Sequence, residues 1–171
     1  MKTMIGVLTA GLLVAGCASM APSATMATAK LEPTTGNTAN GTVTFTQRGD
    51  KVRVNAKVAG LTPGGHGFHI HEKGDCSSGD GMSSGGHFNP RGKPHAVHTT
   101  PDRHTGDMPM LVADASGNAT LVIELDVMTI GSGETNIVGR GLIVHMDPDD
   151  FATQPTGNSG ARVACGVITR S

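Results

Sequence analysis

Histidines are concentrated in one part of this chain. The sequence of 171 residues contains eight of them, and seven lie between His66 and His104, with the last at His145. Imidazole is a common ligand of transition metals, so a local cluster of histidines favours a metal site. The histidine cluster therefore predicts a fold that is organised around bound metal.

Composition excludes several other classes of function. Lys and Arg number 13 against 14 Asp and Glu, and the only aromatic residues are four Phe. A nucleic-acid partner needs a basic surface or stacking aromatics, so we expect none. The length favours one compact domain with its own hydrophobic core.

The N-terminus has the pattern of an export signal. Lys2 precedes an apolar run from Met4 to Val14, which is too short for a permanent membrane span. We therefore expect residues 1–16 to be a signal peptide. The run ends in Val14-Ala15-Gly16-Cys17, which resembles a bacterial lipobox and implies a lipid on the sulfur of Cys17. The alternative is an ordinary signal that is cleaved after a small residue.

Residues 17–38 and 39–171 differ in composition. The first segment starts with Cys17, to which the lipobox resemblance assigns a lipid, and its remainder is rich in Ala, Thr, Pro and Ser without apolar periodicity, which predicts a flexible tether. The second contains the histidines and carries the folded domain. If Cys17 is lipidated, Cys76 and Cys165 remain as an even pair in an oxidising compartment, which predicts a disulfide. Two buried free thiols are the alternative.

The domain reads as all-β, because apolar residues alternate with polar ones and no segment has helical periodicity. Residues 41–58 predict a hairpin with a turn at Arg48-Gly49-Asp50, and Leu61–Gly65 predicts another turn. Further strands are expected at 67–71, 111–113, 119–125, 137–145 and 162–169. Segments 72–107 and 146–161 have no strand pattern, and such long loops need bound metal or a disulfide to order them.

The predicted strand 67–71 places His69 and His71 on the same face, and His145 ends another predicted strand. Three imidazoles from a rigid sheet would suit a transition metal. The long loop adds three histidines and one carboxylate, a complete four-coordinate set for Zn²⁺: His87, His95, His104 and Asp107. A His-x-His pair alone would also fit a cupin-type enzyme with one metal, but that interpretation leaves the loop residues unexplained.

Several motifs resemble one family in order and spacing. They are Gly67–Glu72 (GFHIHE), Gly85–Pro90 (GGHFNP), Arg103–Asp107 (RHTGD), Gly139-Arg140 with Val144-His145, and Gly157-Asn158 with Arg162–Ile168. Together they resemble copper–zinc superoxide dismutase, specifically its bacterial periplasmic branch, over about residues 41–170. The resemblance implies a Greek-key β-sandwich, or flattened barrel, with two long metal-ordering loops.

The resemblance also assigns roles to individual residues. Copper would be held by His69, His71, His87 and His145. Zinc would be held by His87, His95, His104 and Asp107, so His87 would serve both metals. Asp149 would link His69 to His95, Arg162 would orient the anion beside copper, Thr156 would line the channel, and Cys76–Cys165 would be the family's disulfide. His66 and His98 are expected not to be ligands.

The implied function is conversion of superoxide to oxygen and hydrogen peroxide by alternate reduction and reoxidation of copper, with a structural zinc. The implied location is the bacterial envelope, where a lipid would anchor the protein to the outer membrane. Two features depart from the family. Segment 146–161 has no Lys or Arg, which leaves Lys73, Arg91 or Lys93 to attract the anion. No aromatic residue occurs at 97–99, which leaves monomer and homodimer both open.

Two further interpretations compete with the enzyme. A metal-buffer lipoprotein of the same fold would bind copper and zinc without turnover, but it would not need the anion-orienting arginine. A purely structural sandwich would explain none of the histidines.

Overall fold

The computed structural model describes residues 25–171, and its regular structure is almost entirely β. The ten strands are β1 (Met26–Pro33), β2 (Asn40–Arg48), β3 (Lys51–Ala59), β4 (Gly64–His66), β5 (Phe68–His71), β6 (Leu111–Ala113), β7 (Ala119–Leu125), β8 (Gly141–His145), β9 (Arg162–Val167) and β10 (Thr169–Arg170). One short 3-10 turn, η1, spans Met82–Ser84. The all-β prediction is confirmed.

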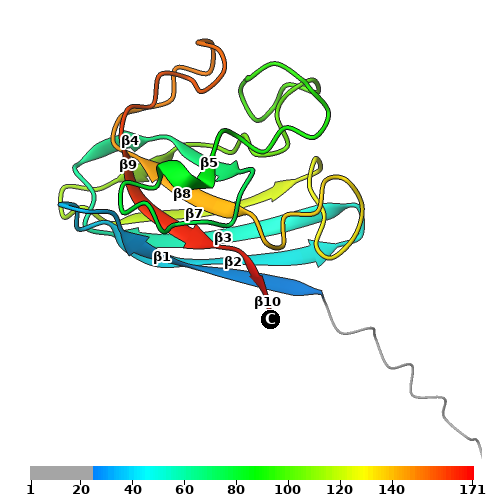
Figure 1. Ribbon diagram of the computed structural model, residues 1–171, viewed down its shortest axis with the longest axis horizontal. Coiled ribbons are helices and arrows are strands. Elements are labelled where there is room, and N and C mark those ends of the chain that lie inside the picture. Colours follow the sequence, from blue (N-terminus) through cyan, green and yellow to red (C-terminus); the bar gives the residue numbers. More distant parts are fainter. Residues whose placement is uncertain (1–24) are drawn as a thin grey trace, which may run out of the picture.

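Most strands belong to one curled sheet in the order β5-β8-β9-β1-β2-β3-β7, and β10 pairs with β1 (Figure 1). All of the pairings are antiparallel. The separate pair β4-β6 contacts the sheet through β6 and β7. The curled sheet forms the flattened barrel that the sequence predicts.

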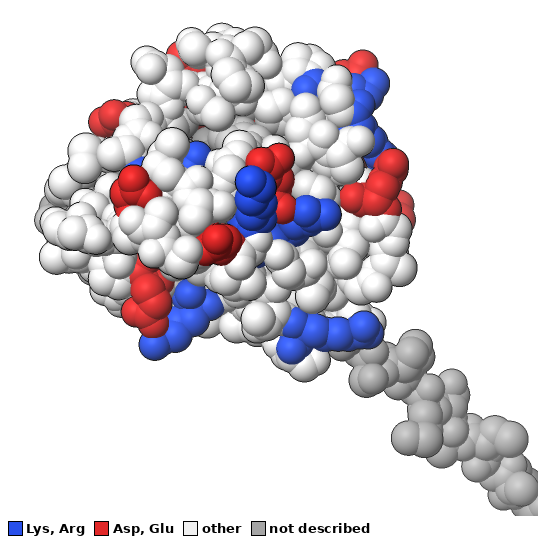
Figure 2. All heavy atoms as spheres, viewed as in Figure 1, with Lys and Arg blue, Asp and Glu red and all other residues white. Residues whose placement is uncertain are grey.

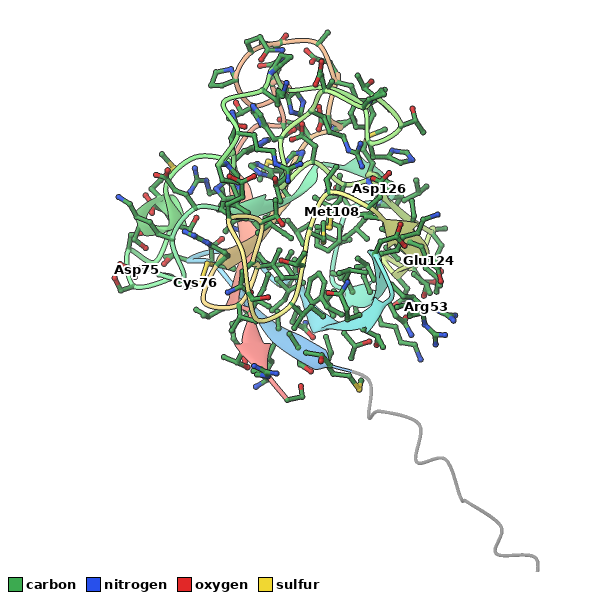
Figure 3. All side chains as sticks on the ribbon, turned by 90° about the vertical axis from the view of Figure 1, so that its right-hand side faces the viewer. Arg53, Asp75, Cys76, Met108, Glu124 and Asp126 are labelled. Atoms are coloured by element: carbon green, nitrogen blue, oxygen red, sulfur yellow. A yellow bond between two sulfur atoms is a disulfide. The ribbon has the colours of Figure 1, made fainter. Side chains whose placement is uncertain are left out.

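The core fills the space inside the curl. Side chains at alternate positions of β2, β3 and β1 point inward, and Phe45, Phe68 and Leu31 are completely buried. Met108 lies among them, whereas Arg53 and Glu124, which face each other across β3 and β7, lie on the outer surface (Figure 3). This two-residue periodicity is the pattern that predicted the hairpin and strands β6 and β7.

Strand β1 corrects the predicted tether. The tether was expected to continue to residue 38, but Met26–Pro33 pairs with β2 on one side and, through Glu32 and Pro33, with β9 on the other. Its inward side chains include Ala27 and Ala29, and Ala27 lies opposite the much larger Phe45. Alanine carries little hydrophobic signal, so the alternation was missed. The predicted signal peptide and Cys17 lie outside the described residues.

The other differences are small. Strand β4 occupies residues where a turn was expected, because Gly64–His66 pairs with β6. Strand β8 begins at Gly141 rather than 137, and the predicted strand 162–169 divides into β9 and the start of β10. Segments 72–107 and 146–161 form the two long loops, and they contain no strand. Both loops lie on the same side of the barrel (Figure 1).

A disulfide closes the first loop onto the sheet, as predicted. Cys76 in the loop is bonded to Cys165 in β9, with a sequence separation of 89 and a Cα–Cα distance of 5.8 Å. Cys76 and Asp75 lie at the side of the molecule away from Arg53 and Glu124 (Figure 3). Closing a loop of this length restricts the unfolded chain and contributes about 4–5 kcal/mol in the chain-entropy model.

The position of β1 gives a first prediction. A chain that starts at Thr25 should unfold cooperatively on heating, because it keeps the strand that joins the two halves of the sheet. A chain that starts at Ala39 should show no cooperative transition in calorimetry or far-ultraviolet circular dichroism, because β2 and β9 lose their shared partner. Equal melting temperatures for the two chains would contradict this account of β1.

Candidate metal centre

Four buried imidazoles converge on one point beside the sheet. His69 and His71 come from β5, His145 ends β8, and His87 comes from the long loop. One ring nitrogen of each lies within 4.8 Å of the corresponding atoms of the others. Within the described chain these converging nitrogens have no hydrogen-bond partner: Nδ1 of His69 and Nε2 of His71, His87 and His145.

The outward-facing nitrogens are all engaged. Nε2 of His69 lies 2.6 Å from a carboxylate oxygen of Asp149, and Nδ1 of His71 donates to the Gly85 carbonyl at 2.9 Å. Nδ1 of His145 contacts the Gly160 carbonyl at 3.3 Å. These contacts place a hydrogen on the outer nitrogen and leave a lone pair on the inner one. An unpartnered buried nitrogen is costly, so four that face each other fit a transition metal.

Burial also keeps these rings in the ligand form. Loss of solvation lowers the pKa of His145 to about 3 and that of His87 to about 4, and it also lowers the pKa of His71. For His87, Asp107 acts in the opposite direction but does not outweigh burial. The imidazoles are therefore neutral at neutral pH, and neutral imidazole is the form that binds metal.

A second group is centred on Asp107. Its Oδ1 atom lies 2.9 Å from Nδ1 of His95, 3.1 Å from Nδ1 of His87 and 3.4 Å from Nδ1 of His104. Four tetrahedral ligands at about 2.0–2.1 Å from an ion lie roughly 3.3 Å apart, so these spacings fit Zn²⁺. Burial favours the neutral carboxyl, but the three imidazoles outweigh it and hold the pKa of Asp107 well below its usual range.

The Asp149 carboxylate connects the two groups. One oxygen contacts Nε2 of His69 at 2.6 Å, and the other contacts Nε2 of His95 at 2.9 Å and accepts the Phe151 amide at 2.7 Å. Gly157 makes room for this carboxylate, because a Cβ atom there would overlap Asp149. Asp149, which was expected to link His69 to His95, therefore contacts one residue of each group.

The backbone explains why the loop lies against β5. Ile70 donates its amide to the Gly106 carbonyl at 3.0 Å and accepts the Phe88 amide at 2.8 Å. Gly106 in turn donates to the Phe88 carbonyl at 2.9 Å. A Cβ at Gly106 would overlap the Ile70 carbonyl, so only glycine permits this close approach. The contacts place both His87 and Asp107 beside β5.

Arg162, the first residue of β9, lies opposite His145 in the strand register and is half-buried. Its guanidinium donates to the carbonyls of Gly81 at 2.6 Å and Gly85 at 2.7 Å. Thr156 is half-buried in the second loop, where its carbonyl accepts from Ser159. No hydrogen bond joins Thr156 to Arg162 in the described residues, so its place on a channel wall stays a prediction.

Two histidines lie outside both groups. His66 is buried, and its ring nitrogens contact the carbonyl oxygens of His145 and Thr62, each at 2.8 Å. His98 belongs to neither candidate set among residues 25–171. Neither was expected to be a ligand.

The cations suggested for attracting an anion differ in their surroundings. Arg91 pairs with Glu134 at 2.8 Å, and Lys93 pairs with Asp102 at 2.9 Å, whereas Lys73 has no ion pair within the described chain. On the face shown in Figure 2, basic and acidic side chains are interspersed, with no broad patch of one sign.

The sequence did not reveal what holds the arginine and the loop in place. The contacts of Arg162 are mainly to backbone carbonyls, which leave no pattern in a sequence. Arg140 donates to the Glu72 carbonyl at 2.6 Å and lies over the Phe88 ring at 4.3 Å. The Gly139-Arg140 motif was the only sign of this contact.

Comparisons with known proteins agree with the geometry. Residues 39–168 match the family model described as "Copper/zinc superoxide dismutase (SODC)". The chain is 44% identical to "Superoxide dismutase [Cu-Zn] 2" of Brassica juncea over 135 residues, covering 75% of this chain and 88% of that protein. It is 40% identical to "Extracellular superoxide dismutase [Cu-Zn]" of Haemonchus contortus over 134 residues, covering 75% of this chain and 72% of that protein.

The fold is also similar to a solved structure. The crystal structure of the clock protein EA4 superimposes with a TM-score of 0.78 at 39% identity, covering 88% of this chain and 97% of that one.

The donor sets predict selective metal loss. Replacing His104 with Ala should weaken zinc binding by more than about 100-fold, beyond the range for residues that act only through a ligand. Copper should stay bound, because His104 belongs only to the second group. Metal content measured by mass spectrometry after dialysis checks this, and equal loss of both metals would contradict the assignment.

Gly157 offers a different test, because Asp149 contacts one ligand of each group. Gly157→Ala should displace the carboxylate and weaken both metals by about 10–100-fold in competition titrations. Gly133→Ala is the matched control, since Gly133 also has a positive φ, 82°, but has open space at the Cβ position. If both variants bind metal equally well, Asp149 does not depend on Gly157.

Proposed function

This chain belongs to the copper/zinc superoxide dismutase family, and we propose that it converts two superoxide anions and two protons into oxygen and hydrogen peroxide. The observation that carries the proposal is a set of four buried imidazole nitrogens, without partners among residues 25–171, beside a half-buried arginine. The copper ligands are His69, His71, His87 and His145. The zinc ligands are His87, His95, His104 and Asp107.

When bound, copper supplies one-electron redox chemistry, and zinc supplies a structural charge without redox change. The protein residues bind the anion and move the proton. Arg162 presents a permanent positive charge that attracts and orients superoxide. Nε2 of His87 has no protein partner in the described chain, and His87 is the one residue that belongs to both donor sets, so we assign to this atom the proton that is passed to the product.

Asp149 keeps the outer nitrogens of two candidate ligands in fixed tautomers. Asp149 accepts from His69 and His95, so these rings hold one orientation while electrons and protons move. Nδ1 of His87 lies beside Asp107 in the zinc set, so zinc held there would occupy its lone pair and leave Nε2 as the nitrogen that takes a proton.

We place the protein in the bacterial envelope, in the periplasmic branch of the family, where it would protect the envelope from superoxide. The support is the predicted signal peptide at 1–16 and the lipobox resemblance at Cys17. One relative is named an extracellular enzyme. Strand β1 begins at an end of the barrel away from the second loop, 146–161 (Figure 1). Of the described residues, none belongs to a helix long and apolar enough to cross a bilayer.

Activity and salt dependence test the enzymatic proposal together. The copper- and zinc-loaded protein should consume superoxide, and Arg162→Glu should keep both metals but lose most of the rate, because an attractive charge becomes repulsive. Arg162→Lys should lie between them, since it keeps the charge but loses the planar fork.

The wild-type rate should fall as salt rises through about 0.1 M, where the Debye length is about 10 Å, and the Glu variant should show a flatter or inverted response. The same salt response in both proteins would mean that Arg162 does not face the substrate. A fully loaded but inactive wild type would favour the metal-buffer interpretation.

The lipid anchor has its own test. In a bacterial host given labelled fatty acid, the wild-type chain should carry label and the Cys17→Ser chain should not, because serine cannot form the thioether. Labelling of the Ser variant would rule out Cys17 as the attachment site, and an unlabelled wild type would rule out lipidation.

A further inference from the structure

Ser84 lies between the arginine and the turn that holds it. It is the last residue of η1, and its side chain has no exposed surface. Its hydroxyl donates to the Gly81 carbonyl at 2.8 Å and accepts Nη1 of Arg162 at 2.9 Å. Because Nη1 also donates to the Gly81 carbonyl at 2.6 Å, the three groups form a closed triangle of hydrogen bonds.

The triangle holds the turn as well as the guanidinium. Gly81 precedes η1 with a φ of 76°, and its carbonyl also receives the Ser84 amide at 3.2 Å. The Ser84 hydroxyl is therefore the only side-chain oxygen among the described residues that accepts from Arg162. The other acceptors of the Arg162 guanidinium are the backbone carbonyls of Gly81 and Gly85, whose positions depend on the turn.

The same turn reaches a candidate copper ligand. The Gly85 carbonyl accepts both Nη2 of Arg162 at 2.7 Å and Nδ1 of His71 at 2.9 Å. A guanidinium is planar and its donors have fixed directions, so its orientation follows from the places of its acceptors. A shift of the turn would therefore change the orientation of the Arg162 guanidinium relative to the imidazoles.

We propose that Ser84 is a positioning residue, whose buried hydroxyl holds the guanidinium of Arg162 in the orientation that receives superoxide. That the guanidinium receives superoxide rests on the proposed function. That Ser84 fixes the orientation of Arg162 does not. Ser84 itself touches neither substrate nor metal.

The first measurement uses the full chain loaded with metal. The arginine reagent phenylglyoxal is added, and the rate of modification at Arg162 is followed by peptide mass spectrometry. A hydrogen bond to a charged group changes an equilibrium by about tenfold or more, and two carbonyl acceptors remain, so Ser84→Ala should raise the rate about three- to tenfold.

Ser83→Ala is the matched control. Ser83 is also in η1, and its hydroxyl donates to the Asp75 carbonyl at 2.9 Å without contacting Arg162. Its Arg162 modification rate should equal that of the wild type. If Ser84→Ala lowers the melting temperature but leaves the rate at Arg162 unchanged, Ser84 is merely structural and the proposal is wrong.

The second measurement uses metal-loaded protein. Ser84→Ala should lower superoxide consumption by about three- to tenfold in the wild-type background and have no further effect when Arg162 is already Ala, since coupled residues are not additive. Equal losses in both backgrounds would overturn the proposal. An inactive wild type would refute the proposed function alone, because the reagent still reports whether Ser84 holds Arg162.

Discussion

The imidazole of His87 belongs to both donor groups, and the rest of the site is arranged around it. Its Nε2 faces the three histidines of the sheet, and its Nδ1 faces Asp107. The ring can serve both groups only if its loop lies against β5, which the backbone pairing of His71 with His87 ensures. The two groups therefore form one structure, and a change at either side of the ring reaches the other.

Polar contacts order the loops around this ring, together with Phe88 of the first loop, which packs in the hydrophobic core. The first loop, 72–107, approaches β5 through backbone hydrogen bonds at Gly106. The second loop, 146–161, contributes Asp149, whose carboxylate contacts both groups. Buried carboxylates and imidazoles are costly unless they are paired, and the ring nitrogens that have no partner among residues 25–171 would be paired by bound metal. Metal binding therefore contributes to the order of these loops as well as to chemistry.

The sequence predicted the parts of the molecule that have strong local patterns. Alternation identified the hairpin of β2 and β3 and the bounds of β6 and β7, and the single face shared by His69 and His71 followed from strand geometry. Strand β1 was missed because its inward residues include two alanines, which carry little hydrophobic signal. The candidate ligands came from histidine clustering and family motifs, whereas the contacts that hold Arg162 are carbonyls and one serine, for which a sequence carries no distinctive sign.

The central claim is that two metals share His87, and anomalous X-ray scattering from crystals of the loaded protein at the copper and zinc edges tests it most directly. We expect one copper peak among His69, His71, His87 and His145, and one zinc peak among His87, His95, His104 and Asp107, both in contact with the His87 ring. A single peak, or two peaks of which one does not touch His87, would contradict the account.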